Sequence, residues 1–379
     1  MGCAHGAFRV SGGVAVQTDW FVPAHPLKGA TLHKMLYTIE RATKASRSGV
    51  AVAAVAIAVL VSLPWWGESS WMRTLVEFAC LLTLAQMWNL LAGYGGVVSI
   101  GQQAFIGLGA YALFVLADDL QVNPFACVPL AGLIAGIIAL PTAKVVFRLH
   151  GGYFAVGTWV VAEVYRLVIA NASYLGGGSG KSLAAVRAFP KVVRESTTYW
   201  IALAVAVGAI ALVYLLLRSR HGLALTSIRD SERASASQGI NVSGTKVWVY
   251  IISALGCGMA GALYFLNTVR VSPDAAFNVG WTANIIFIVV IGGIGTIEGP
   301  ILGTLIFFLL RGGLADYGSV YLIVLGAVAV VVMVKFPRGL WGFIQQRFDL
   351  RFFPVQRRVR MDVLLPEASS AGASPAPPH

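Results

Sequence analysis

Charged residues are scarce in this chain, and long stretches lack them entirely. Only 12% of the residues are Asp, Glu, Lys or Arg, whereas 57% are hydrophobic. Soluble domains carry about 25% charged residues, so this composition excludes an ordinary soluble protein and indicates an integral membrane protein. The surplus of Lys and Arg gives a net charge of +12. In a membrane protein that surplus indicates basic cytoplasmic loops rather than a nucleic-acid partner.

Residues suited to catalysis or metal binding are also few. The four cysteines and six histidines show no metal-ligand or redox spacing, and no Gly-x-Ser-x-Gly motif occurs. Residues Gly176 to Ser182 look like a phosphate-binding loop, but Leu175 stands where that motif requires a glycine. The sequence therefore predicts no enzyme, no metal site and no cofactor.

The longest uncharged run determines the fold class. Phe78 to Ala117 contains no Asp, Glu, Lys, Arg or His, and it is interrupted by Gly93, Gly95 and Gly96. As a single helix this run would be about 60 Å long, roughly twice the hydrocarbon core of a bilayer. It must therefore cross the membrane twice or fold back at the glycines.

Similar apolar runs along the chain predict an all-α integral membrane protein. We expect a polytopic helical bundle of about 8–10 transmembrane helices with glycine-rich broken or re-entrant segments. Trp281–Leu310 is too long for one straight crossing and contains Glu298 and Pro300, which predicts two short helices or a re-entrant hairpin. The predicted spans are Gly49–Trp66, Leu75–Ala92, Val97–Ala117, Pro124–Phe147, Tyr153–Ala170, Tyr199–Leu217, Val247–Leu266, Trp281–Leu310 and Ser319–Val334.

Basic residues predict the domain organisation and the orientation. They gather on both sides of the apolar region, so both termini are expected in the cytoplasm. Residues 1–48 form a predicted N-terminal extension, 49–336 the transmembrane domain and 218–246 a cytoplasmic loop within it. Residues 337–379 form a tail that is first basic and then rich in Pro, Ala and Ser.

Two glycine-rich segments interrupt the apolar regions and place polar side chains there. One interpretation is close helix packing, with Gly295, Gly299 and Gly303 as a ladder of small residues. The other is broken helices whose backbone lines a path across the membrane, and the two are compatible. The predicted helix breaks are Gly95, Gly96, Gly292, Gly293, Gly299 and Pro300, and the candidate path residues are Ser99, Gln102, Gln103, Glu163, Thr296 and Glu298.

Glu163 has a second interpretation. It stands three residues before Arg166, a spacing that brings both side chains to one face of a helix. The pair is then either an ion pair near the outer end of its span or part of the path.

The loop from Arg218 to Lys246 contains signals for a short helix. Ser227 followed by Asp230 resembles a capping box, and Gly239 is a natural C-terminal stop. The predicted helix carries Arg229, Asp230, Glu232 and Arg233. It is either a solvated surface helix or a docking helix that a cytoplasmic partner grips.

This loop resembles the coupling loop of LivM-type permeases, the membrane subunits of branched-chain amino acid ABC importers. The similar segments are Arg218–Leu225, Ile228–Glu232, Gly239–Val242 and Lys246. Three further blocks agree with the same family, namely Gly93–Tyr111, Gly152–Arg166 and Ser272–Gly303.

The resemblance implies a non-catalytic permease subunit in a bacterial inner membrane. Its expected partners are two cytoplasmic ABC ATPase subunits, a homologous second permease (LivH-like), a periplasmic substrate-binding protein and the lipid bilayer. The implied ATPase-coupling residues are Ser227, Arg229, Asp230, Glu232, Arg233 and Gly239.

Two alternatives to this function stay open. Permeases for urea and short amides share the same blocks, so the solute is not fixed. A secondary transporter working alone is the alternative from a different class. Many relatives have histidine where Gln102 stands, so a titrating role is not carried over to that position.

Overall fold

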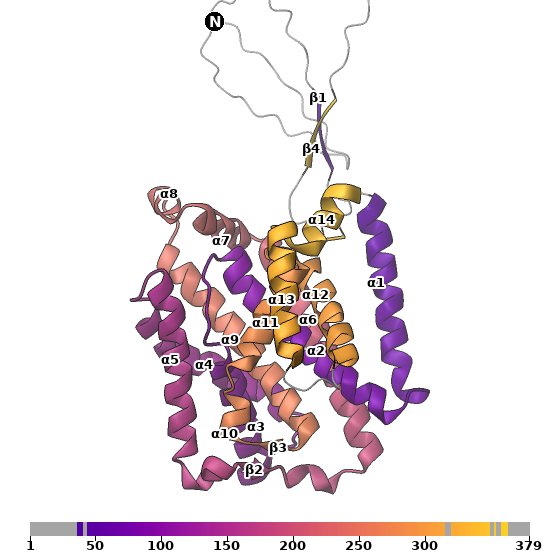
Figure 1. Cartoon of the computed structure of the whole chain (residues 1–379), viewed down its shortest axis with the longest axis vertical. Helices are drawn as coiled ribbons and strands as arrows, with labels where there is room; N and C mark the ends of the chain where they lie inside the picture. The colour runs from indigo at the N-terminus through magenta and orange to yellow at the C-terminus, as the bar shows by residue number, and fades with distance from the viewer. Residues whose placement is uncertain (1–35, 41–43, 315–319, 349–351, 354–357, 363–379) are drawn as a thin grey trace, which may run out of the picture.

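The computed structural model describes residues 36–40, 44–314, 320–348, 352–353 and 358–362 as a bundle of α-helices (Figure 1). Most of the predicted N-terminal extension and of the C-terminal tail lies outside these residues. The long helices are α1 (Lys44–Ser62), α2 (Ser69–Asn89), α3 (Gln103–Phe114), α4 (Cys127–Val146), α5 (Gly152–Ala170), α6 (Lys191–Arg218), α9 (Val242–Thr268), α11 (Gly280–Gly292), α12 (Glu298–Leu314) and α13 (Val320–Lys335).

Shorter elements lie at the two ends of this bundle. One end carries α7 (Arg220–Asp230), α8 (Glu232–Ser237), α14 (Gly339–Phe348) and the antiparallel pair of β1 (Leu36–Glu40) with β4 (Arg358–Asp362) (Figure 1). The opposite end carries α10 (Pro273–Ala276) and the pair of β2 (Lys181–Ser182) with β3 (Arg270–Val271). We call these the α7 end and the β2 end.

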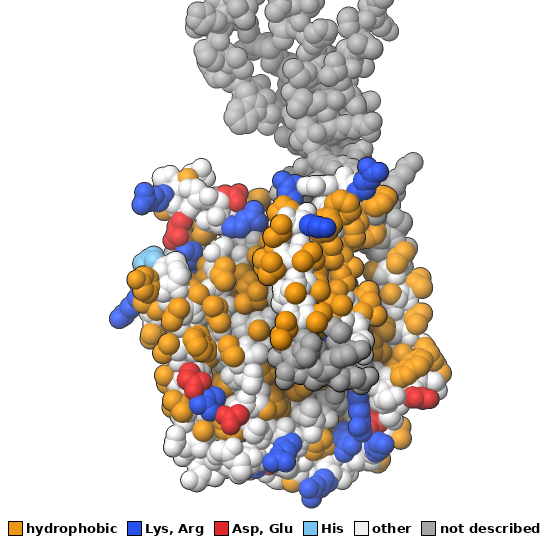
Figure 2. All heavy atoms as spheres, viewed as in Figure 1, with side chains coloured by type: hydrophobic (Ala, Val, Ile, Leu, Met, Phe, Trp, Pro, Cys, Tyr) orange, Lys and Arg blue, Asp and Glu red, His pale blue; other side chains and the backbone are white. Residues whose placement is uncertain are grey.

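The predicted fold class is confirmed. Within the described residues, 7 helices are long and apolar enough to cross a membrane, and a shorter apolar helix spans Val52–Trp65. On the face drawn in Figure 2, hydrophobic side chains form a band between charged side chains at the two ends. Exposed Val156, Val160 and Val164 of α5 illustrate the apolar surface that a membrane protein presents.

The predicted span Val97–Ala117 crosses the bundle only partly as a helix. Gly93 contacts α7, whereas Asp119 forms an ion pair with Lys181 of β2, so the chain between them runs from one end to the other. α3 supplies only 12 residues of this crossing, about 18 Å. The π-helical turn Val115–Asp119 after α3 and an irregular segment before α3 supply the rest, in agreement with the glycine-rich broken segment expected in this run.

Glycines allow the central helices to approach closely. α9 packs against α3 and α4, and a Cβ atom added at Gly109 or Gly261 would overlap the backbone carbonyl of Gly258 or Ile106. Side chains at these crossings would hold the backbones apart, so small residues set the interhelical distance.

The segment Trp281–Leu310 contains two antiparallel helices joined by a turn, an arrangement that both expectations share. α11 ends at Gly292 and α12 begins at Glu298. Added Cβ atoms at Gly292 and Gly303 would overlap the carbonyl oxygens of Gly299 and Ile288, respectively. Gly299 and Gly303 therefore belong to the packing ladder, whereas Gly295 lies in the turn between the helices.

A matched pair of glycines in α12 tests this packing. Gly303→Ala places a methyl group against the Ile288 carbonyl, and overpacking of this kind costs about 1–3 kcal/mol. Gly312→Ala meets no described atom within 4 Å and should be neutral or slightly stabilising. We expect a lower melting temperature in detergent for Gly303→Ala only; equal melting temperatures would contradict the tight α11–α12 contact.

Candidate functional site

The first helix break follows α2. The helix continues as a π-helical turn from Leu90 to Tyr94, and the chain then runs irregularly as far as α3. Buried Ser99 fixes this segment, because its carbonyl accepts a hydrogen bond from Trp88 Nε1 (2.9 Å) and its hydroxyl accepts one from the Gly101 N–H (3.2 Å). Gly95 and Gly96 lie at the start of this break, and Gly96 has a φ of 68°.

The second break is the turn between α11 and α12. Gly293 and Gly295 adopt positive φ values of 130° and 76°, which glycine reaches without steric strain. Gly299 and Pro300, which were predicted as breaks, lie instead in the first turn of α12. A proline is compatible with that position, because the first N–H groups of a helix have no intrahelical partner.

Two amide side chains of α2 hold the second break. Asn89 Oδ1 accepts a hydrogen bond from the Gly295 N–H (2.8 Å), and Asn89 Nδ2 donates to the Thr296 carbonyl (2.7 Å). One turn earlier, Gln86 Nε2 donates to the Ile297 carbonyl (2.7 Å). Both side chains are fully buried. Three backbone groups of the turn are thus satisfied by side chains of α2.

Thr296 and Glu298 also stabilise this turn. The Thr296 hydroxyl donates to the Gly293 carbonyl (2.8 Å) and accepts from the Gly299 N–H (3.1 Å). Glu298 accepts a hydrogen bond from the Phe353 N–H (3.0 Å). Both candidate path residues therefore have structural contacts at the α7 end.

Gln102 and Gln103 connect the first break to neighbouring helices. Gln102 Nε2 lies 3.5 Å from Ser253 Oγ of α9, and Gln103 Oε1 accepts a hydrogen bond from the Thr282 hydroxyl of α11. Both glutamines are buried, so their amide groups are engaged within the bundle.

The cytoplasmic loop forms two helices rather than one. Ser227 lies inside α7, and the residue that caps α8 is Ser231, whose hydroxyl accepts from the Ala234 N–H (3.4 Å). The predicted capping box of Ser227 with Asp230 is therefore wrong. Gly239 follows α8 with a φ of 83°, the left-handed conformation typical of a helix C-terminus.

Of the residues expected to couple to an ATPase, Ser227 and Glu232 bond to neighbouring helices, whereas Asp230 and Arg233 make no such bond in the described part of the chain. Ser227 bonds to Ser235 of α8 (2.8 Å between hydroxyl oxygens), and Glu232 forms an ion pair with Lys246 of α9 (2.7 Å). Asp230 ends α7 and pairs with Arg229, whereas Arg233 is exposed and makes no hydrogen bond or ion pair within the described residues.

Arg229 points toward the bundle. Its Nη1 atom donates a hydrogen bond to the Gly93 carbonyl (3.0 Å). The α7 helix therefore contacts the first break directly.

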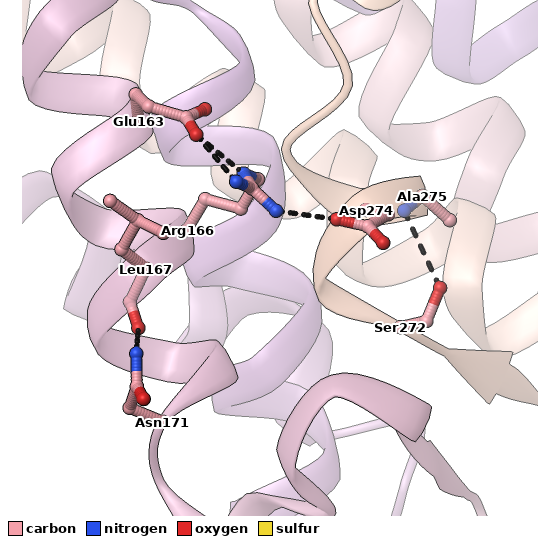
Figure 3. A network of polar contacts seen from close by, with 7 residues as sticks. All are labelled: Glu163, Arg166, Leu167, Asn171, Ser272, Asp274 and Ala275. Carbon is pink, nitrogen blue, oxygen red and sulfur yellow. Dashed lines mark hydrogen bonds and ion pairs between the residues drawn. The ribbon is translucent and has the colours of Figure 1, made fainter.

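Glu163 belongs to a cluster of charges on the hydrophobic face of the bundle. Arg166 lies between Glu163 of its own helix (2.6 Å) and Asp274 of α10 (2.5 Å), as Figure 3 shows. Figure 2 shows a compact group of acidic and basic side chains among hydrophobic ones over α5 and α10. The cluster ties α5 to the start of α10 and forms the ion pair that one interpretation predicted.

Sequence reasoning missed Gln86 and the role of Asn89. A signal was available, because two amide side chains three residues apart in an uncharged run fall on one helix face. What they bind lies more than two hundred positions away along the chain, which periodicity cannot reveal.

Apolar helices form this bundle, and the backbone groups freed at its helix breaks form hydrogen bonds within the protein. These features define a multi-pass membrane protein of the transporter type. The sequence agrees with this class and refines it. The chain belongs to the family described as "Branched-chain amino acid transport system / permease component", which matches residues 70–333.

Individual relatives are more distant. The chain is 26% identical over 289 residues to the "High-affinity branched-chain amino acid transport system permease protein LivM" of Escherichia coli, covering 69% of this chain and 68% of the relative. It is 24% identical over 280 residues to the "Probable branched-chain amino acid transport permease protein LivM" of Methanocaldococcus jannaschii, covering 62% and 79%. It is 30% identical over 129 residues to the "Ribose import permease protein RbsC" of Escherichia coli, covering 32% and 40%. No solved structure matches the chain.

Replacing Asn89 tests how the second break is held. Asn89→Leu keeps the approximate size of the side chain but leaves the Gly295 N–H and the Thr296 carbonyl unpaired, at a cost of about 1–3 kcal/mol each. We expect faster amide hydrogen exchange across residues 293–297, measured by mass spectrometry. Asn171→Leu is the control, because Asn171 bonds only within its own helix end (2.8 Å to the Leu167 carbonyl). Unchanged exchange in Asn89→Leu would contradict the assignment.

Proposed function

We propose that this chain is the transmembrane permease subunit of an ATP-binding-cassette importer for branched-chain amino acids or a related small polar solute. The family match over residues 70–333 carries the proposal. The two relatives named LivM support the same solute class. The chain provides the membrane path, and ATP hydrolysis belongs to two separate cytoplasmic ATPase subunits.

The charges of the two ends support a cytoplasmic location for the α7 end. Arg218, Arg220, Arg233 and Lys335 are among the basic residues there, as expected for the cytoplasmic side of an inner-membrane protein. The opposite end also carries basic residues, but acidic residues offset some of them: Lys181 pairs with Asp119 (2.7 Å) and Arg73 with Glu195 (2.6 Å). In this orientation the ATPase subunits dock on α7 and α8, and both termini are cytoplasmic. A periplasmic binding protein delivers the solute to the β2 end.

A second permease similar to LivH completes the path in this proposal. The charged cluster supports such a neighbour, because the Glu163 and Asp274 side chains are 45% and 78% exposed on a hydrophobic face. Exposed charges among hydrophobic side chains face protein or water rather than lipid. Glu163 is therefore the best-placed path candidate. The polar groups of the other five candidates form hydrogen bonds within this chain, so these residues support the wall of the path rather than face the solute. They are Ser99, Gln102, Gln103, Thr296 and Glu298.

The solute itself is proposed to be selected mainly by the binding protein. The similarity to a ribose import permease indicates that related bundles serve chemically different solutes. A urea or short-amide importer is therefore the alternative within this class.

Transport by the reconstituted complex tests the proposed function. Proteoliposomes containing this chain, the second permease and the ATPase subunits should accumulate radiolabelled leucine only with ATP and the binding protein. This chain alone should accumulate none. Accumulation by the chain alone, driven by an ion gradient, would instead indicate a secondary transporter.

A charge swap tests whether Glu232 contacts an ATPase subunit. Glu232→Lys should uncouple ATP hydrolysis from uptake, because it reverses an exposed charge at the start of α8. Adding Lys246→Glu restores the ion pair with opposite polarity. If an ATPase subunit contacts the Glu232 carboxylate directly, the double variant should stay uncoupled. Restored coupling would show that only the internal ion pair matters.

A further inference from the structure

We propose that Arg229 is the positioning residue through which movement of α7 reaches both helix breaks at once. This inference rests on the proposed function, in which a cytoplasmic ATPase moves α7 and α8. It differs from the sequence-based expectation, which placed Arg229 on the surface that the ATPase contacts.

The Arg229 side chain lies against residues of both breaks. An added Cβ atom at Gly96 would lie 3.2 Å from Arg229 Cγ and 3.4 Å from its Cα, so Gly96 supports the aliphatic stem. An added Cβ atom at Gly295 would lie 3.4 Å from Arg229 Nη1. The same Nη1 atom donates to the Gly93 carbonyl (3.0 Å). Arg229 thus contacts residues on both sides of the junction between the breaks.

The two breaks are also joined to each other beneath Arg229. An added Cβ atom at Gly93 would lie 2.6 Å from the Gly295 nitrogen, and Asn89 links the end of α2 to Gly295 and Thr296. A displacement of Gly93 therefore moves the second break as well. Gln86 extends the same connection to Ile297.

Neighbouring contacts allow α7 to move as one unit with α8. Leu225 and Ile228 are the residues of α7 that are buried against the bundle. The hydrogen bond between Ser227 and Ser235 fixes α8 to α7. Asp230 accepts from Arg229 Nε and Nη2, both at 3.2 Å, which orients the guanidinium toward Gly93. Apolar contacts hold α7 in place, and Arg229 gives it a directional link, because a hydrogen bond from a charged donor fixes geometry.

Coupling efficiency distinguishes this role from a merely structural one. In the reconstituted complex, Arg229→Ala should lower leucine accumulated per ATP hydrolysed by about tenfold, the scale of one hydrogen bond from a charged donor. ATP hydrolysis and the amount of copurified ATPase subunit should stay near wild type. Arg229→Lys should recover most of the coupling, because it keeps a cationic donor. Arg148→Ala, which replaces an exposed arginine after α4 and outside α7 and α8, is the matched control and should behave as wild type.

The possible outcomes are separable. If the wild-type complex shows no ATP-dependent uptake, the proposed function fails, whatever Arg229 does. If the wild type transports and Arg229→Ala keeps its coupling ratio, the inference about Arg229 is wrong. Loss of copurified ATPase subunit in Arg229→Ala would assign Arg229 to docking instead. Parallel loss of uptake and hydrolysis without rescue by Arg229→Lys would assign it to folding.

Discussion

The backbone hydrogen bonds at the two helix breaks are the constraint on which the rest of this structure depends. A helix satisfies its own N–H and C=O groups, and each break leaves several of them to be paired with other groups of the protein. Trp88, Gln86 and Asn89 supply partners from within α2, and Thr296 supplies two more from inside its own turn. One long buried helix thus stabilises both irregular segments.

The arrangement around the breaks follows from that constraint. Because Asn89 brings the second turn against the end of α2, Gly93 and Gly295 meet, and only glycines allow such close approach. The junction is open on the side of α7, where Arg229 occupies it. On the far side, Gly339 at the start of α14 packs against Gly293, so a second surface helix covers the same turn. Irregular backbone, two surface helices and the end of α2 therefore form one contact region at the α7 end.

The sequence predicted the broad architecture well and its junctions less well. Uncharged apolar runs located the membrane-crossing segments, and paired glycines located the breaks near Gly95 and Gly292, because both signals are local. The start of α8 was misplaced because Ser227 has an acidic residue three positions later, whereas Ser231, which caps α8, has Ala234 there and lacks that signal. The roles of Gln86, Asn89 and Arg229 depend on partners far away in sequence, so no periodicity could reveal them.

Distance measurements test most directly whether α7 and the second break move as one body. Spin labels can be placed at exposed Leu223 of α7, at exposed Ile294 of the turn and at exposed Tyr174 near the β2 end. Cys3 is replaced by serine for this experiment, and Cys80, Cys127 and Cys257 are buried and should react little. When nucleotide is added to the assembled complex, the 223–294 distance should stay constant while both labels move relative to position 174. A nucleotide-dependent change in the 223–294 distance would contradict the account.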